Sequence, residues 1–453
     1  MNNADWIHRD LRVLWHPCTQ MKDHDDGVLP LIPIARGDGV WLYDFDGRRY
    51  FDGISSWWVN LFGHANPRIN DAIAEQLDRV EHVMLAGFTH RPAIELSERL
   101  IRMTPEGLDR VFFADNGSAG VEVALKMSHH YWRNLGRPEK SGFVTLANSY
   151  HGETLGTLGV GDVALYREQY RPLMHEALVA PTPDCYAREP GESCADVARR
   201  AAAGLEALLA GHHASLAALI VEPLVQCAGG MRMYDPEYLR LARALCTQYD
   251  VHLIADEIAV GFGRTGTLFA IEQAGIVPDY LCLSKGLTGG YLPLAVTVTR
   301  GEIFDAFYDD YVRLNAFLHS HSYTGNPLAC AAANATLDLF DSEPVLEDNR
   351  LKAGVIAEGL ASLNDHPHVA DVRQTGMIAA VEMAPDRSRR VAYPWQERRG
   401  LSVYRYGLTQ GAILRPLGVV SYLMPPYVAT EDELRWVCGL IREGVDRATR
   451  GAG

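Results

Sequence analysis

The sequence predicts an α/β protein, in which a large domain holds a mainly parallel, doubly wound sheet and a smaller domain is α+β. Short apolar runs alternate with segments of helical periodicity through the middle of the chain, and this alternation ends near residue 330. Hydrophobic residues make up 47% of the 453 residues and charged residues 22%, which excludes a disordered or fibrous protein.

The individual elements follow from local patterns. A hairpin is expected over 40–53, with its turn at Asp46-Gly47, and a helix is expected to begin after Asn66, with Pro67 in its first turn. Buried strands are predicted at 111–114, 143–146, 219–221, 251–255 and 280–283. Amphipathic helices are predicted at 118–134, 195–210 and 236–249. Strands separated by helices imply a parallel sheet with helices on both faces.

The last third of the chain has a different pattern. A helix begins near Asn326-Pro327, strand-like segments follow at 369–382 and 412–424, and a final amphipathic helix covers 430–448. We therefore predict an N-terminal segment of the small domain over 1–60, the large domain over 61–335, and the C-terminal part of the small domain over 336–453.

Charge and cysteine content narrow the class of protein. The formal net charge of −15 argues against nucleic acid or an anionic membrane as the main partner. None of the eight cysteines forms a C-x-x-C pair, so a zinc cluster is not predicted, and a disulfide framework is not expected in so long a chain. The N-terminus has no basic and apolar leader pattern, and no apolar run is long enough to cross a membrane, so we expect a cytoplasmic protein.

Three positions next to predicted strands carry chemistry. Gly117 and Ser118 open a helix after a buried strand, where backbone N–H groups can hold a phosphate, although Ser118 could equally be the N-cap. Asp256 ends a strand, where a carboxylate is typical of a site or of a surface ion pair. Lys285 lies between an apolar strand and a glycine-rich turn, where desolvation favours a nucleophilic amine, unless the side chain reaches the surface.

Together these groups match the needs of pyridoxal phosphate. Its phosphate needs donors, its pyridinium nitrogen needs a carboxylate, and its aldehyde needs an amine. The G-x-G-x-x-G pattern at 261–266 begins too far from the preceding strand for a dinucleotide fingerprint, so a tight turn is expected there. No histidine cluster has a recognised ligand spacing, and no metal is predicted.

The chain resembles the class III aminotransferases, which are fold-type I pyridoxal phosphate enzymes. Within the class it is similar to enzymes of biotin synthesis that move an amino group from S-adenosylmethionine to 8-amino-7-oxononanoate. The segments that carry the resemblance include 149–152, Val221-Glu222-Pro223, 256–266 and 284–294, together with Trp15-His16-Pro17, 55–58, 229–234 and 422–426.

The resemblance implies a role for each matching residue. Lys285 would bear the cofactor as a Schiff base and move protons, Asp256 would pair with the pyridine nitrogen, and Tyr150 would cover the ring and touch substrate. Gly117 and Ser118 would bind the phosphate of their own chain, and His321 and Ser322 that of a homodimer partner. The substrate-binding residues would be Trp57, Trp58, Tyr150, Arg264, Ser320, Arg415, Tyr422 and Cys18, with Arg415 holding the carboxylate of the keto acid.

Two positions depart from the family pattern. Cys18 stands where a tyrosine could stack on adenine, and Ser320 replaces a glycine that lines the substrate site. Lysine as amino donor, or another amine as in ω-aminotransferases, is therefore an alternative to S-adenosylmethionine. A silent, pyridoxal-bound regulator is a third hypothesis, and the intact set of Lys285, Asp256, Gly117 and Ser118 argues against it.

Overall fold

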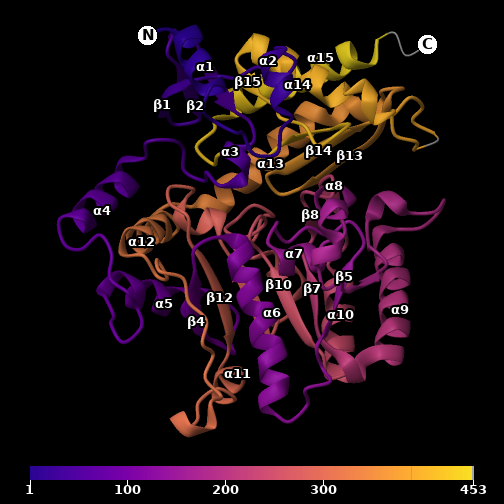
Figure 1. The fold of residues 1–453 in the computed structure, drawn as a ribbon. Coiled ribbons are helices and arrows are strands. Elements are labelled where there is room, and N and C mark those ends of the chain that lie inside the picture. Colours follow the sequence, from indigo (N-terminus) through magenta and orange to yellow (C-terminus); the bar gives the residue numbers. More distant parts are fainter. Residues whose placement is uncertain (389, 451–453) are drawn as a thin grey trace. The chain divides into compact units, whose positions relative to one another are not determined.

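The computed structural model describes residues 1–388 and 390–450, which divide into two compact units (Figure 1). The large unit covers Arg68–Leu346. The small unit combines Met1–Pro67 with the chain from Glu347 onward. The breaks between the units therefore lie near residues 67 and 346, whereas the sequence suggested domain limits near 60 and 335.

The large unit is built on a seven-stranded sheet. Apolar residues fill its central strands, which are buried along their whole length, as expected of a sheet covered on both faces. From edge to edge the strands are β4 (Leu108–Ala114), β12 (Ala295–Arg300), β11 (Tyr280–Leu283), β10 (His252–Asp256), β7 (Leu216–Val221), β5 (Gly142–Leu146) and β6 (Leu178–Ala180). Each predicted strand is present. β12 was not predicted, and it pairs antiparallel with both neighbours, β4 and β11.

The predicted helices of the large unit also form. They are α6 (Gly117–Asn134), α9 (Cys194–His212) and α10 (Glu237–Gln248). In Figure 1 α6 runs along the sheet, where it contacts strands from β4 to β7. Its N-cap is Asn116, whose side chain accepts from the N–H of Ala119. Ser118 is therefore not the cap, and its hydroxyl stays available at the start of the helix.

The remaining helices of the large unit surround these layers. They include α4 (Pro67–Leu77), which starts at the proline that the sequence predicted, and α12 (Pro327–Ser342), which is capped by Asn326. The others are α5 (Arg91–Met103), α7 (Leu155–Gly159), α8 (Ala164–Arg167) and α11 (Gly301–Asp305). A short hairpin of β8 (Val225–Gln226) and β9 (Arg232–Met233) follows β7.

The small unit contains two sheets. One has the order β1 (Ile34–Asp38), β2 (Trp41–Asp44), β3 (Arg49–Asp52) and β15 (Ala412–Ile413), and the other has the order β13 (Val369–Thr375), β14 (Ile378–Met383) and β16 (Val420–Leu423). Because β15 pairs parallel with β3, the N-terminal and C-terminal segments of the small unit share one sheet. The predicted segment 369–382 is a hairpin, which turns at Gly376 in the left-handed region.

Helices complete the small unit. They are α1 (Asn3–Leu11), α2 (Met21–Asp25), α3 (Ser55–Trp58), α13 (Val345–Leu360), which begins two residues before the unit boundary, α14 (Arg399–Gln410) and α15 (Glu431–Thr449). α15 carries a capping box between Thr430 and Glu433, and it packs against α14. No helix within the described residues is both long and apolar enough to cross a membrane.

One cysteine pair is bonded, although the sequence predicted no disulfide framework in a chain of this length. Cys185 and Cys194 form a disulfide, with their Cα atoms 4.9 Å apart. Cys185 begins a 3₁₀ turn and Cys194 begins α9, so the intervening loop brings the two residues within the ordinary span of such a bond. The spacing of nine residues carried no signal of this pairing, because it matches no recognised motif.

Candidate active site

The site in the large unit is built at the carboxyl ends of three adjacent strands. Asp256 is the last residue of β10, Glu222 directly follows β7, and Lys285 lies two residues beyond β11. Parallel strands end at the same edge of the sheet, so these charged groups come together on a frame of buried apolar residues. The structure thus places the predicted Asp256 and Lys285 at the carboxyl ends of neighbouring strands.

Lys285 is held in an unusual backbone conformation. Its backbone φ angle is 47°, in the left-handed region that residues other than glycine rarely adopt. Burial lowers the pKa of its ammonium group, and the charges of Asp256, Cys227 and Glu222 oppose that shift. A lowered pKa makes the neutral, nucleophilic amine more available near pH 7.

The carboxylate of Asp256 is fixed through both oxygens. One oxygen lies 2.7 Å from Nδ1 of His151, and the other accepts the N–H of Ile258 at 3.1 Å. Asp256 and His151 are both buried. An aspartate that is desolvated but fully hydrogen-bonded can hold a cationic group in a defined place.

Glu222 belongs to a segment that carries the family resemblance, but the sequence analysis assigned it no role in the site. Its carboxylate accepts the N–H of Tyr150 and that of Cys227, each at 3.0 Å. Burial raises the pKa of Glu222 well above its ordinary value, and the nearby charge of Asp256 adds to this. The signal that could have revealed it is its place directly after a buried strand, the same signal that marked Asp256.

The start of α6 forms a narrow cradle. The backbone of Gly152 has a φ of 124° and approaches Ser118 so closely that a Cβ at position 152 would lie 2.1 Å from the Ser118 Oγ. A Cβ at Gly117 would lie 3.0 Å from Ile258. Two glycines thus keep side chains away from a helix N-terminus, where backbone N–H groups and a hydroxyl can bind an anion.

Other predicted residues of the large unit lie in different surroundings. The ring of Tyr150 packs against Tyr166, with ring centroids 5.2 Å apart, and its hydroxyl donates to Glu153. Arg264 is only 1% exposed, within the glycine-rich segment 261–266, which forms turns as expected.

The segment 319–322 is the most exposed part of the predicted site. Ser320 and Ser322 are exposed, whereas His321 is half-buried and its Nδ1 lies 3.5 Å from Asp115. Nδ1 of His319 is 2.8 Å from the Lys126 ammonium group.

Residues predicted to bind substrate also occur in the small unit, where they form two groups. The guanidinium of Arg415 lies over the ring of Trp57, 5.1 Å from its centroid, and its Nη2 is 3.4 Å from the carbonyl oxygen of Cys18. Trp57 and Arg415 share the wall of a cavity of about 270 Å³ with His16, His24 and Tyr404.

Trp58 and Tyr422 form the second group. The Trp58 indole N–H donates to the Tyr422 hydroxyl at 3.0 Å, and both side chains are buried. All four residues of α3, from Ser55 to Trp58, have positive φ angles of 47° to 74°. Trp57 nevertheless remains 38% exposed. This backbone turn therefore buries the indole of Trp58 and leaves the indole of Trp57 accessible.

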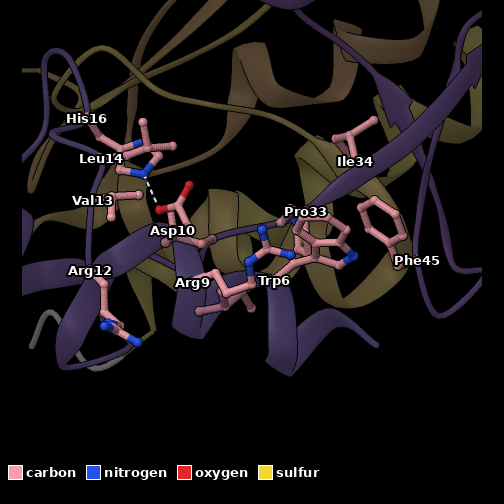
Figure 2. Close-up of a pocket in the computed structure, with 13 residues that line it drawn as sticks. Trp6, Arg9, Asp10, Arg12, Val13, Leu14, His16, Pro33, Ile34 and Phe45 are labelled. Carbon is pink, nitrogen blue, oxygen red and sulfur yellow. Dashed lines mark hydrogen bonds and ion pairs between the residues drawn. The ribbon is translucent and has the colours of Figure 1, made fainter. Parts of the chain in front are cut away.

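A second hollow in the small unit, of about 610 Å³, lies beside α1 (Figure 2). Its apolar wall includes Trp6, Val13, Ile34 and Phe45. Asp10 and His16 also line it, and the Asp10 carboxylate lies 2.6 Å from Nε2 of His16. None of the residues that the sequence predicted for the site lines this hollow.

Fold and site together define an aminotransferase. The family model for class-III aminotransferases matches residues 22–445, and the chain belongs to this family. It is 47% identical to the adenosylmethionine-8-amino-7-oxononanoate aminotransferase of Helicobacter pylori, over 98% of both chains. It is 45% identical to the enzyme of that name from Anoxybacillus flavithermus, over 99% of this chain and 98% of that one.

Solved structures agree with this family. The adenosylmethionine-8-amino-7-oxononanoate aminotransferase of Methanocaldococcus jannaschii superimposes with a TM-score of 0.91 at 34% identity, over 98% of this chain and 99% of that one. An omega transaminase from Pseudomonas jessenii, solved in complex with PMP, gives 0.93 at 30% identity over 98% of each chain. The predicted fold class, with its mainly parallel sheet, is confirmed.

Proposed function

We propose that this protein transfers an amino group from S-adenosylmethionine to 8-amino-7-oxononanoate, giving 7,8-diaminononanoate for biotin synthesis. The observation that carries the proposal is the grouping of Lys285, Asp256 and Glu222 at three adjacent strand ends. Near full-length similarity to enzymes named for this reaction supports the choice of substrates. The two substrates would react in turn at one site, in a ping-pong sequence.

The residues present fit pyridoxal phosphate. The start of α6 would supply the donors for its phosphate, through the Ser118 hydroxyl and the backbone N–H of Gly117, and Gly152 places no side chain against Ser118. Asp256 would hold the pyridinium nitrogen, and the ring of Tyr150 would cover one face. When bound, the cofactor supplies an electron sink for the bond that breaks at the amino carbon.

The chain's own groups would then handle protons and orientation. The Lys285 Nζ takes the proton from the donor's amino carbon and returns one to the acceptor's carbon. Glu222 holds the Tyr150 segment in place through the main chain. Arg415, beside Trp57, would bind the carboxylate of the keto acid, and Trp58, Tyr422, Arg264, Ser320 and Cys18 complete the proposed substrate set.

The amino donor is tested by single-turnover measurements. We expect S-adenosylmethionine to convert the cofactor from its aldehyde to its amine form faster than lysine does, at matched subsaturating concentrations. The exposed Trp57 and the half-buried Tyr150 would offer aromatic surface for adenine and the sulfonium charge, with contacts of about 0.5–2 kcal/mol each. Faster conversion by lysine would reverse the choice of donor.

A second outcome of the same screen concerns the acceptor. The similarity to omega transaminases at 30% identity makes an ω-aminotransferase the alternative function. If simple amines and ketones react well, and 8-amino-7-oxononanoate does not react, that alternative replaces our proposal. Binding of the cofactor without turnover of any amine would favour a regulatory protein.

We further propose that the protein acts as a cytoplasmic homodimer in which the segment 319–322 reaches the partner's phosphate site, with His321 and Ser322 as donors. Exposed apolar side chains flank that segment, including Leu314, Leu318 and Tyr323. We expect light scattering at assay concentration to give a dimer of about 100 kDa, twice the 50.1 kDa chain. A fully active monomer in the same sample would contradict this arrangement.

A further inference from the structure

The imidazole of His151 contacts the carboxylate of Asp256 in the candidate site, and the proposed reaction gives that imidazole no role. Its ring is enclosed in the large unit, its Nδ1 lies 2.7 Å from Asp256, and its Nε2 makes no hydrogen bond within residues 1–388 and 390–450. An ionised carboxylate can only accept, so the proton between these two atoms belongs to His151.

The two ring nitrogens of His151 have different surroundings. Nδ1 lies within hydrogen-bond distance of Asp256, whereas Nε2 is buried and makes no hydrogen bond within the described residues. The contact with Asp256 is therefore the hydrogen bond that fixes the orientation of the ring.

The neighbouring residue is fixed at the same time. The N–H of Tyr150 donates to Glu222 after β7, while the side chain of His151 donates to Asp256 at the end of β10. The consecutive residues Tyr150 and His151 therefore connect their loop to the ends of two adjacent strands, β7 and β10. The ionisable groups that interact with Asp256 include Glu222, Lys285, Cys227, Glu257 and Cys282. Tyr234 interacts with Glu222, and Arg264 interacts with Cys227.

We propose that His151 is a positioning residue, which orients the Asp256 carboxylate toward the cofactor's ring nitrogen and sets how firmly that nitrogen keeps its proton. The proposal rests on the assignment of Asp256 made above. His151 touches neither substrate nor the reacting carbon in this account, and it acts through Asp256 alone.

The test uses the holoenzyme, the cofactor-free chain and two substitutions. His151→Leu keeps much of the volume and removes the donor, whereas His151→Asn restores an N–H near the place of Nδ1. We expect His151→Leu to weaken binding of pyridoxal phosphate about tenfold, as for loss of a hydrogen bond to a charged group. His151→Asn should recover most of that loss.

A spectroscopic titration separates positioning from packing. When the ring nitrogen is held less firmly, less positive charge remains on the ring, and the nitrogen joining cofactor and Lys285 keeps its proton to higher pH. The midpoint of the visible absorbance change should therefore rise by about half a pH unit or more in His151→Leu. It should return toward the wild-type value in His151→Asn.

His252→Asn is a matched control, because His252 is a buried histidine at the other end of β10, bonded to the Ser128 hydroxyl. It should leave the titration midpoint unchanged. If His151→Leu lowers thermal stability but leaves the midpoint and the cofactor affinity as in wild type, the role is structural and the proposal is wrong.

Asp256→Asn separates this inference from the function on which it rests. If Asp256→Asn moves the midpoint and His151→Leu does not, only the role of His151 fails. If neither variant moves it, the assignment of Asp256 fails, and the role of His151 fails with it.

Discussion

Lys285→Ala is expected to abolish multiple turnover and to remove the visible band of the bound cofactor, while the chain stays folded. No other amine lies on the ends of β7, β10 and β11. Burial lowers the pKa of Lys285, against the opposing charges of Asp256, Cys227 and Glu222, so its amine loses its proton at a lower pH than an ordinary lysine does. The same nitrogen is needed twice, as nucleophile and as proton carrier.

Lys140 offers a matched control for that experiment. It is also a buried lysine of the large unit, its ammonium donates to the carbonyl of His213, and burial lowers its pKa to about 8. It lies just before β5, at the opposite end of the strands from the site. Lys140→Met should cost stability but leave the cofactor's absorbance intact. Multiple turnover by Lys285→Ala would refute the assignment of that residue.

Arg415→Ala is expected to slow the half-reaction with the keto acid far more than the half-reaction with the amino donor. A guanidinium can bind a carboxylate through two hydrogen bonds and so set the distance of the ketone from the reacting centre. Loss of such a charge-assisted contact costs about 1.5–3 kcal/mol, roughly 10- to 150-fold in rate. Stopped-flow measurement of each half-reaction separates the two effects.

Arg405→Ala is the control, because Arg405 is an exposed arginine of the same unit on α14. Loss of an ordinary surface charge should cost well under about 1 kcal/mol in both half-reactions. Equal slowing of both half-reactions by Arg415→Ala would contradict a specific carboxylate role. It would indicate instead that Arg415 supports the cavity around Trp57.

The buried strands and the residues at their ends could be predicted because each depends on local sequence. Five apolar runs of the right length marked β4, β5, β7, β10 and β11. β12 was not predicted because its polar threonines interrupt the apolar run. It also runs antiparallel to β11, whereas an alternation of strands and helices predicts parallel strands. Its threonines are accommodated by hydrogen bonds to distant carbonyls, such as that of Thr297 to Gly120.

The parts of the site that could not be predicted depend on distant contacts. The sequence suggested Ser118 as a possible cap of α6, and only the geometry of the helix start shows that Asn116 is the cap instead. The contact between His151 and Asp256 joins residues 105 positions apart. Nothing local in the segment 55–58 signals positive φ angles, which serine and tryptophan rarely adopt.

The left-handed turn of α3 has a consequence for how this chain can change through evolution or design. Each non-glycine residue in that conformation costs about 1–2 kcal/mol, and the turn is retained by bonds from Ser56 to Asp52 and from Ser55 to the carbonyl of Met424. Selection for thermal robustness alone favours glycine here, which releases the stored strain. The same change would let the Trp57 side chain move more freely, so a glycine variant would gain stability while losing a fixed aromatic wall of the cavity.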